Sequence, residues 1–186
     1  MLADALCPDP LVVCVCPAGF GGADTFHVAV FAWALLGFAS VYHGAARRAF
    51  DLSVATAHAR SSIALSRSMA HHPEVQHHVA EMRMALDASE ALLERTASDW
   101  ATGVPHADWP VRIIGARHRV ITESFDIVDR AMDLTGGTGA FKRNRMEQLF
   151  RDVRMGRFHP GNTLLAHELV GKLRLGLNPD DPQRWG

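Results

Sequence analysis

Residues 111–135, VRIIGARHRVITESFDIVDRAMDLT, decide the fold. Mostly apolar side chains recur in this stretch every three or four residues. They form a continuous seam on one face of an α-helix, as in a helix that packs in a bundle. Pro110 suits the helix start because its missing N–H would have no partner there, and Gly136 follows the last seam residue. The seam runs in alternating steps of three and four residues through Val111, Ile114, His118, Ile121, Phe125, Val128, Met132 and Thr135.

The preceding stretch shows the same period. Its seam is stopped by Gly103 and Pro105. Two seams in succession predict two long helices that pack in one bundle. The residues of this earlier seam are Val75, Val79, Met82, Leu86, Ser89, Leu93, Thr96 and Trp100.

Further upstream, the chain has no proline between Phe26 and Pro73. This stretch has room for a helix of about a dozen turns at 3.6 residues each. A side-chain oxygen of Asp24 or Thr25 is placed to cap its start. We expect the helix to end just before Pro73, because the residue preceding a proline avoids the α region.

Two shorter helices are predicted downstream, one over residues 145–154 and a last one from about residue 161 to residue 175. Helices joined by short breaks predict an all-α fold, an up-and-down four-helix bundle over residues 25–177. Residues 1–24, which proline and glycine punctuate, are expected to form an irregular leader, and residues 178–186 a tail.

The composition is that of an ordinary globular protein, with 48% hydrophobic and 21% charged residues among 186. A formal net charge of -1 at pH 7 gives no global attraction to nucleic acid or to an anionic membrane. The richest apolar run, residues 26–41, is interrupted by polar residues and glycine, so we expect no transmembrane helix. The start of the chain lacks the basic region of a secretory signal.

Cysteine use favours a reducing compartment. Cys7, Cys14 and Cys16 all lie in the first sixteen residues. Three thiols do not make a closed disulfide framework, and a structural zinc would need a fourth ligand. We therefore expect a cytoplasmic protein without a metal site.

Histidines are numerous but poorly spaced for metal binding. His71, His72, His77 and His78 gather around Pro73, which prevents a clean ligand face, so a surface cluster at a helix boundary is expected. His118 lies on the seam of residues 111–135 and is expected to be a hydrogen-bonded core or interface histidine.

Two motifs allow both a structural and a functional interpretation. Residues 136–139, Gly-Gly-Thr-Gly, are typical of a helix C-cap and turn, but their bare backbone amides also permit close approach of a cofactor. The basic residues between Lys142 and Arg157 are typical of a solvated helix face, and functionally they suit the phosphates of a cofactor or of coenzyme A.

The segment 131–176, AMDLTGGTGAFKRNRMEQLFRDVRMGRFHPGNTLLAHELVGKLRLG, resembles the closing portion of acyl-CoA dehydrogenases. The resemblance lies in the Gly-Gly-x-Gly turn, the helix with Glu147 and Leu149, the pair Arg151-Asp152 and the final helix. Residues 26–100 resemble the two preceding helices of the family, with Arg60 where the family has an arginine near the flavin. The similarity covers about residues 25–177.

The resemblance implies the C-terminal helical bundle of a flavoprotein that binds FAD between domains and across a subunit contact. It implies that Arg60 approaches the flavin pyrophosphate. It also implies that the turn of Gly136, Gly137, Thr138 and Gly139 lies against FAD of a partner subunit. A homo-oligomer and an acyl-CoA substrate follow from the same resemblance.

The sequence departs from the family at two points. The N-terminal and middle portions of the family have no counterpart in it. The usual glutamate base falls on Pro160, which takes no proton, and His159 is the titratable residue beside it. His159 is therefore our candidate catalytic residue, as a general base near neutral pH or in a relative similar to flavin monooxygenases. The structural alternative is a histidine at a helix N-terminus followed by proline in the first turn.

Two functions remain at this point. One is an acyl-CoA dehydrogenase-like flavin oxidoreductase domain that acts on the CH–CH group of an acyl thioester and is completed by other domains or a partner chain. The other is a non-catalytic bundle that keeps only the oligomer contact. Oligomerisation is expected in both, because the helices carry more apolar surface than a lone bundle buries.

Overall fold

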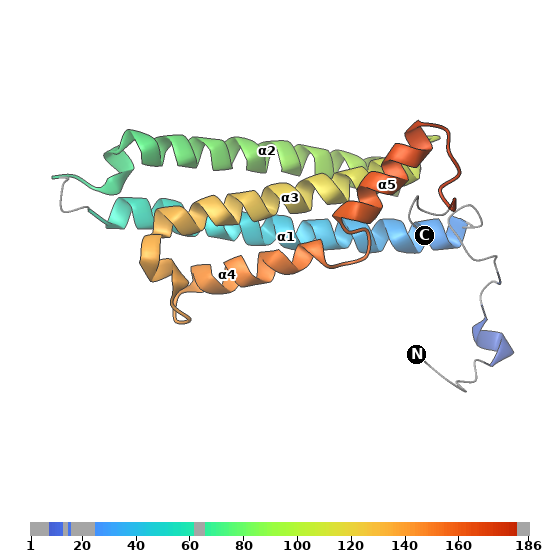
Figure 1. Ribbon diagram of the computed structural model, residues 1–186, viewed down its shortest axis with the longest axis horizontal. Helices are drawn as coiled ribbons and strands as arrows, with labels where there is room; N and C mark the ends of the chain where they lie inside the picture. Colours follow the sequence, from blue (N-terminus) through green and yellow to red (C-terminus); the bar gives the residue numbers. More distant parts are fainter. Residues whose placement is uncertain (1–7, 13–14, 16–24, 62–65, 182–186) are drawn as a thin grey trace.

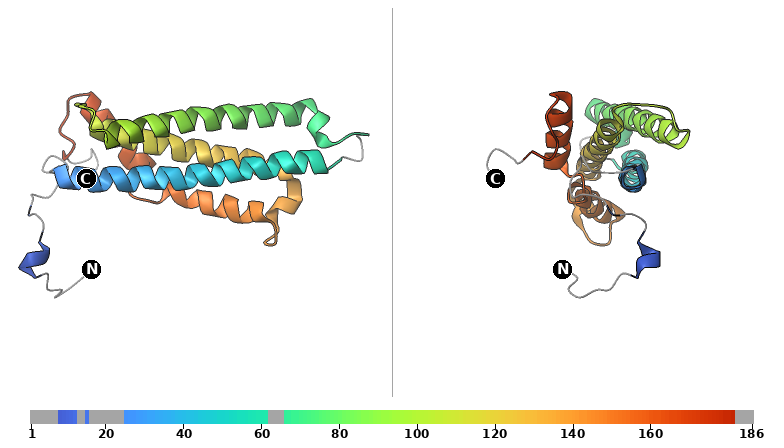
Figure 2. Two further views of the ribbon diagram at one scale, coloured as in Figure 1. Left: turned by 180° about the vertical axis from the view of Figure 1, so that it is seen from behind. Right: turned by 90° about the vertical axis from the view of Figure 1, so that its right-hand side faces the viewer.

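The computed structural model describes residues 8–12, 15, 25–61 and 66–181. Four helices run along the long axis of the molecule, and α5 crosses them near one end (Figures 1 and 2). The predicted all-α bundle is confirmed. Its helices are α1 (Thr25–Ala59), α2 (Pro73–Ala101), α3 (Trp109–Thr135), α4 (Arg145–Arg154) and α5 (Thr163–Arg174), joined in part by the 3₁₀ turns η2 (Met69–His71), η3 (Gly136–Ala140) and η4 (Met155–Arg157), with η1 (Asp9–Leu11) near the start.

Helix α3 is the central element, because it contacts α1, α2, α4 and α5. The seam predicted for it is confirmed, since Ile114, Ile121, Val128 and Thr135 are buried and the seam residues between them are half-buried. Its buried face is wider than one seam because helices cover it on several sides. Further buried residues of α3 are Ile113, Ala116, Arg117, Val120, Ser124, Ile127, Ala131 and Leu134.

The seam of α2 is also confirmed. Six of its eight residues are buried, and Val79 and Trp100 are half-buried. Met82 and Leu86 join the larger core cluster with α1, α3 and α4, and Leu93 joins the second cluster toward α5. The alternating spacing therefore identified the packed face of α2.

The expected end of the first helix was wrong. Helix α1 ends at Ala59, well before the proline that starts α2. Ser61 and Ser68 instead form an antiparallel bridge, and the N–H of Met69 donates to the carbonyl of Arg60 at 2.8 Å. Serine side chains compete for backbone hydrogen bonds and so weaken a helix interior, which explains why a proline-free stretch still breaks here.

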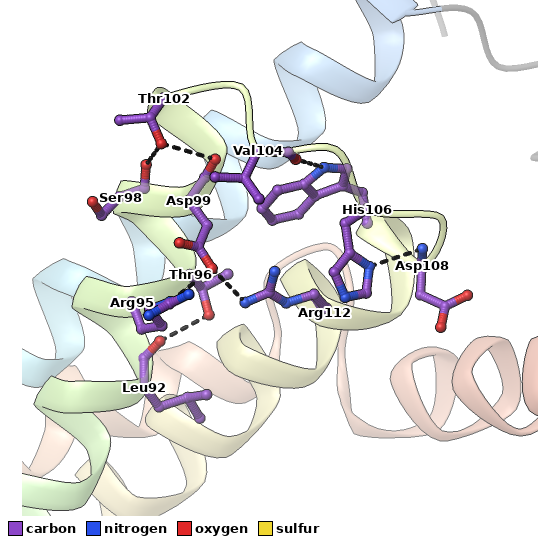
Figure 3. Close-up of polar contacts among 11 residues, drawn as sticks. Leu92, Arg95, Thr96, Ser98, Asp99, Thr102, Val104, His106, Asp108 and Arg112 are labelled. Atoms are coloured by element: carbon purple, nitrogen blue, oxygen red, sulfur yellow. Dashed lines mark hydrogen bonds and ion pairs between the residues drawn. The ribbon is translucent and has the colours of Figure 1, made fainter.

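A charged clamp joins the end of α2 to the start of α3 (Figure 3). Asp99 is 7% exposed and pairs with Arg95 at 2.8 Å and with Arg112 of α3 at 2.9 Å. Arg112 also lies 4.9 Å from the ring centre of Trp109, which packs edge-to-face on Trp100. Hydrogen bonds from Arg95 and then Arg112 lower the pKa of Asp99.

The outer face of α1 carries an exposed apolar stripe. Val30, Trp33 and Val41 are 52%, 57% and 68% exposed. A Cβ added at Gly37 or at Gly44 would meet no atom within 4 Å. The stripe, whose residues are spaced by three or four, consists of Phe26, Val30, Trp33, Gly37, Val41 and Gly44.

The same helix contains one stretch, residues 26–59, that is long and apolar enough to cross a membrane by length and composition. A third of the window that meets this test is buried within the bundle. Core helices and segments near an N-terminus meet the test as well.

Several expectations concern residues outside the described part of the chain. These are the three cysteines, most of the leader and the end of the tail. The proposed helix cap at Asp24 or Thr25 also concerns side chains that are not described.

Candidate functional site

Arg60 lies against the glycine-rich turn that follows α3. Gly136 ends α3 with a positive φ of 67°, which confirms the predicted C-cap. Arg60 Nη1 donates to the carbonyl of Thr135, the last residue of α3, and to Oγ1 of Thr138 at 3.3 Å. The residues predicted to bind the cofactor therefore come together within one chain, although 75 residues separate Arg60 from Thr135.

The backbone of this turn is open to a ligand at two of its glycines. A Cβ added at Gly137 would meet no atom within 4 Å, and one added at Gly136 would approach Arg60 at 3.9 Å. Gly139 differs, because a Cβ there would lie 2.7 Å from Sδ of Met132. Gly139 therefore serves close packing, whereas the first two glycines leave the turn accessible beside a positive charge.

This combination fits the diphosphate of FAD. The Arg60 side chain is exposed, and a guanidinium has five N–H donors, so its contacts with the turn leave donors for a ligand. The N–H of Gly136 is already donated to the carbonyls of Met132 and Asp133, so the planar guanidinium of Arg60 is the group suited to bind phosphate oxygens. Arg60 would hold the group, and the bare backbone of Gly136 and Gly137 would let it come close.

His159 lies in the loop between η4 and α5. Its Nε2 is 2.7 Å from the hydroxyl oxygen of Tyr42 in α1. Its ring also stacks on Phe38, with ring centres 4.4 Å apart and planes 12° apart. The ring is half-buried, so α1 orients the candidate catalytic side chain.

The structural alternative for His159 was wrong. Helix α5 begins at Thr163, and the side chain of Asn162 caps it by accepting from the N–H of Leu165 at 3.1 Å. His159 and Pro160 therefore precede the helix and belong to a loop. Asparagine is a stronger N-cap than the residues before it, which explains the later start.

Arg117 was missed by the sequence analysis. It is 1% exposed, and its Nη2 donates to the carbonyls of Gly156 at 2.8 Å and of His159 at 3.4 Å. Nη1 donates to the carbonyl of Gly161, and burial lowers the pKa of Arg117. The signal in the sequence was an arginine next to a seam position of α3. An arginine buried at such a position needs partners, so it indicates a polar contact inside the bundle.

The site of Arg60 and the glycine turn lies far from the site of His159 in the folded bundle. Tyr42, which contacts His159, and Arg60 are eighteen residues apart on α1 and its end, or about 27 Å at 1.5 Å per residue. The glycine turn and His159 therefore lie near different parts of the bundle, and the fold does not bring them together into one pocket.

The remaining predicted histidines and basic residues occupy surface or interface positions. His71 and His77 are exposed, and the six basic side chains between residues 142 and 157 are exposed as well. His118 packs edge-to-face on His167 of α5, with ring centres 4.7 Å apart. Within the described residues, no three histidine, cysteine, aspartate or glutamate side chains gather as metal ligands would.

A shallow cavity of about 140 Å³ lies between α1 and α2. Its walls are mainly apolar and include neither His159 nor the glycine turn. It is small for a drug-sized ligand, whose pockets reach roughly 300–1,000 Å³. The lining residues are Val54, Ala57, His58, Ala70, Val75, Gln76 and Val79.

Comparison with known proteins identifies the family to which this helical bundle belongs. The model of the acyl-CoA dehydrogenase C-terminal domain matches residues 36–163. This match covers more than half of the chain, which therefore belongs to the acyl-CoA dehydrogenase family and corresponds to its C-terminal domain.

Individual relatives agree with the family. The chain is 28% identical over 139 residues to YdbM of Bacillus subtilis, whose name marks it as a candidate acyl-CoA dehydrogenase, covering 74% of this chain and 36% of YdbM. It is 25% identical over 134 residues to cyclohex-1-ene-1-carbonyl-CoA dehydrogenase of Geobacter metallireducens, covering 71% and 34%. The chain thus spans about a third of the length of these relatives.

The fold has close counterparts among solved structures. XiaF from a Streptomyces species, solved in complex with FADH2 and glycerol, superposes with a TM-score of 0.74 at 23% identity. The superposition covers 88% of this chain and 43% of XiaF. At this identity the likeness establishes the fold.

Proposed function

We propose that this chain is the flavin-facing helical domain of an acyl-CoA dehydrogenase-like oxidoreductase that acts on the CH–CH group of an acyl thioester. The observation that carries the proposal is the exposed Arg60 guanidinium beside the open backbone of Gly136 and Gly137. FAD, when bound, supplies the acceptor for the hydride that leaves the acyl chain. The residues of this chain bind and orient the reactants.

Each site has a separate task in this proposal. Arg60 holds the pyrophosphate through its charge, and the bare backbone of Gly136 and Gly137 lets the group come close. His159 acts at the reacting end in this proposal, and its contacts with Tyr42 and Phe38, which orient the ring, support this role. The remaining walls of the flavin and acyl site come from further domains or from a partner chain.

The proposal includes a homo-oligomer in the cytoplasm. Tyr42, which contacts His159, and Arg60 are about 27 Å apart along α1. This separation favours two flavins, each contacted by the glycine turn of one chain and by the His159 region of another. The exposed stripe of α1 offers apolar surface for contact between chains.

One observation favours a second candidate. Pro160 occupies the position of the family's glutamate base, and the neighbouring His159 is already hydrogen-bonded to Tyr42. This arrangement supports either a flavin monooxygenase-like relative or a bundle without its own chemistry. Both alternatives keep the fold and differ from the first proposal in what the flavin site does.

Retention of FAD tests the proposal directly. After incubation with FAD and desalting, the wild-type protein is expected to keep a flavin spectrum. Arg60→Met should weaken FAD binding at least tenfold because it removes the guanidinium that faces the turn. Arg48→Met, which removes an exposed arginine elsewhere on α1, is the matched control and should bind FAD like the wild type. Equal affinity in both variants would show that the cofactor lies elsewhere.

A further inference from the structure

Tyr42 and His159 form a pair that joins α1 to the loop between α4 and α5. The hydroxyl oxygen of Tyr42 and Nε2 of His159 are 2.7 Å apart, and Tyr42 is 8% exposed. The stack of His159 on Phe38 fixes the plane of the imidazole ring. A hydrogen bond and a stack together hold both the position and the rotation of a side chain, as a group that contacts substrate requires.

The loop that carries His159 is itself held tightly. Arg117 donates to the carbonyls of Gly156, His159 and Gly161, which lie before, at and after His159 in the chain. A Cβ at Gly156 would lie 2.7 Å from Cγ2 of Ile121 and 3.3 Å from the ring of Tyr42. The backbone therefore has little freedom to carry His159 away from Tyr42.

The Tyr42 hydroxyl can act as the donor of the pair. Burial raises the pKa of this hydroxyl, an effect that Arg117 opposes and Asp152 increases, so the hydroxyl keeps its proton at neutral pH. The proton of a buried hydroxyl needs an acceptor, and among the described residues Nε2 of His159 is the partner within reach. When Tyr42 donates, Nε2 accepts through its lone pair, and the neutral ring then carries its proton on Nδ1.

The other ring nitrogen is left for a ligand. Among the described residues, Nδ1 of His159 has no hydrogen-bond partner. This atom is also not buried, because the buried side-chain atoms that lack a partner are His43 Nε2, His78 Nδ1 and Arg117 Nε. Nδ1 is therefore the ring nitrogen that stays available to a ligand.

We propose that Tyr42 is a positioning residue that holds neutral His159 with its proton on Nδ1, so that His159 donates a hydrogen bond to an oxygen atom of the substrate. This role replaces that of a general base, because the lone pair of Nε2 is already occupied. In the reaction proposed above, on which this assignment of the oxygen rests, the acceptor is the thioester carbonyl.

Donation to a carbonyl oxygen has a direct chemical effect. An N–H aimed at the oxygen stabilises the negative charge that develops there when a base, which another domain or a partner chain would supply, takes the proton from the neighbouring carbon. A neutral imidazole held in one tautomer can perform this task. The arrangement also explains how a chain with proline at the position of the family's base can keep a residue that acts on the same substrate.

The ¹⁵N signals of the two ring nitrogens show directly which of them carries the proton. The protein is labelled with ¹⁵N-histidine, and His159 is assigned by the signals that vanish in His159→Gln. At pH 8.5, above the ordinary titration range of histidine, wild-type His159 should show a protonated Nδ1 and an unprotonated Nε2. Tyr42→Phe keeps the buried ring and removes the hydroxyl, so its His159 should show the averaged signals of two exchanging tautomers.

Ser40→Ala is the matched control. It also deletes a hydroxyl from α1, one that donates to the carbonyl of Leu36, and it should leave the His159 signals unchanged. A protonated Nε2 in the wild type would overturn the proposal, since Tyr42 would then be the acceptor and Nδ1 a free base. Unchanged His159 signals in Tyr42→Phe would overturn it as well.

A second measurement separates this proposal from the proposed function. Butyryl-CoA is added to the FAD-loaded protein, and its thioether analogue, which lacks the carbonyl, is added in parallel. The Nδ1 signal should move with the thioester and not with the thioether. If neither compound binds, the acyl-CoA function fails, while the tautomer in the free protein still decides the role of Tyr42.

Discussion

Arg117 places a full positive charge inside α3, where no carboxylate accompanies it among the described residues. Its partners are backbone carbonyls of the loop that carries His159. Hydrogen bonds from a charged donor are stronger than neutral ones, so one side chain fixes a loop that has no regular structure of its own. The cost of burying the charge is offset because these carbonyls would otherwise lack donors.

Replacing Arg117 should therefore destabilise the protein more than replacing an exposed arginine. Arg117→Met is expected to lower the free energy of unfolding by about 2–4 kcal/mol, because buried carbonyls lose their donors. Urea unfolding measures the change. Arg119→Met removes an exposed partner of Glu123 and should cost about 0.5 kcal/mol. Equal losses in the two variants would contradict the account of the loop.

At the scale of elements, the bundle depends on how helix ends are joined. The turn between α2 and α3 is held by Asp99, which binds an arginine from each helix (Figure 3). The end of α1 is joined to the end of α3 by Arg60. Both contacts place a charged group at the C-terminal end of a helix, and the second leaves the glycine turn open toward solvent.

The Asp99 clamp predicts a dependence of stability on pH. Because hydrogen bonds from Arg95 and Arg112 lower the pKa of folded Asp99, the unfolded chain binds a proton first as the pH falls below about 4. The stability that the clamp contributes is fully present above that pH. It is lost as the pH falls toward the lowered pKa of Asp99 in the folded protein. The difference in Tm between wild type and Asp99→Asn should therefore shrink between pH 5 and pH 3.

Thermal unfolding monitored by circular dichroism provides this measurement. Asp87→Asn, which deletes an exposed carboxylate of the same helix, serves as the control for the general effect of removing an acid. A wild-type advantage over Asp99→Asn that stays constant down to pH 3 would mean that the clamp does not depend on the charge of Asp99.

The sequence predicts elements better than it predicts contacts between them. The seam from Val75 to Trp100 identified α2 because helix periodicity is local. The end of α1 was missed because a serine-rich stretch breaks the helix without proline or glycine. Tyr42 and His159 are 117 residues apart, so only the folded bundle shows that they meet. Arg60 and the glycine turn were found separately, through family resemblance, and the structure joined them.

At the scale of the whole molecule, the apolar stripe of α1 is the surface that a lone bundle leaves exposed. Stripe residues with this spacing suit a facing helix of another chain. Val41→Glu places a charge on the most exposed of the stripe residues whose exposure is given above and should shift an oligomer toward monomer in sedimentation velocity at micromolar concentration. Met84→Glu, at an exposed apolar residue of α2, should leave the oligomer intact. A monomeric wild type would contradict the expected assembly.

The most direct test of the central claim, that this is a flavin domain acting on acyl thioesters, is the visible spectrum of the FAD-loaded protein during anaerobic addition of butyryl-CoA. We expect the visible absorbance of the oxidised flavin to decrease as the acyl chain is oxidised and the cofactor takes up the hydride. Retained flavin whose absorbance does not change with butyryl-CoA or with longer and cyclic acyl-CoA thioesters would contradict it.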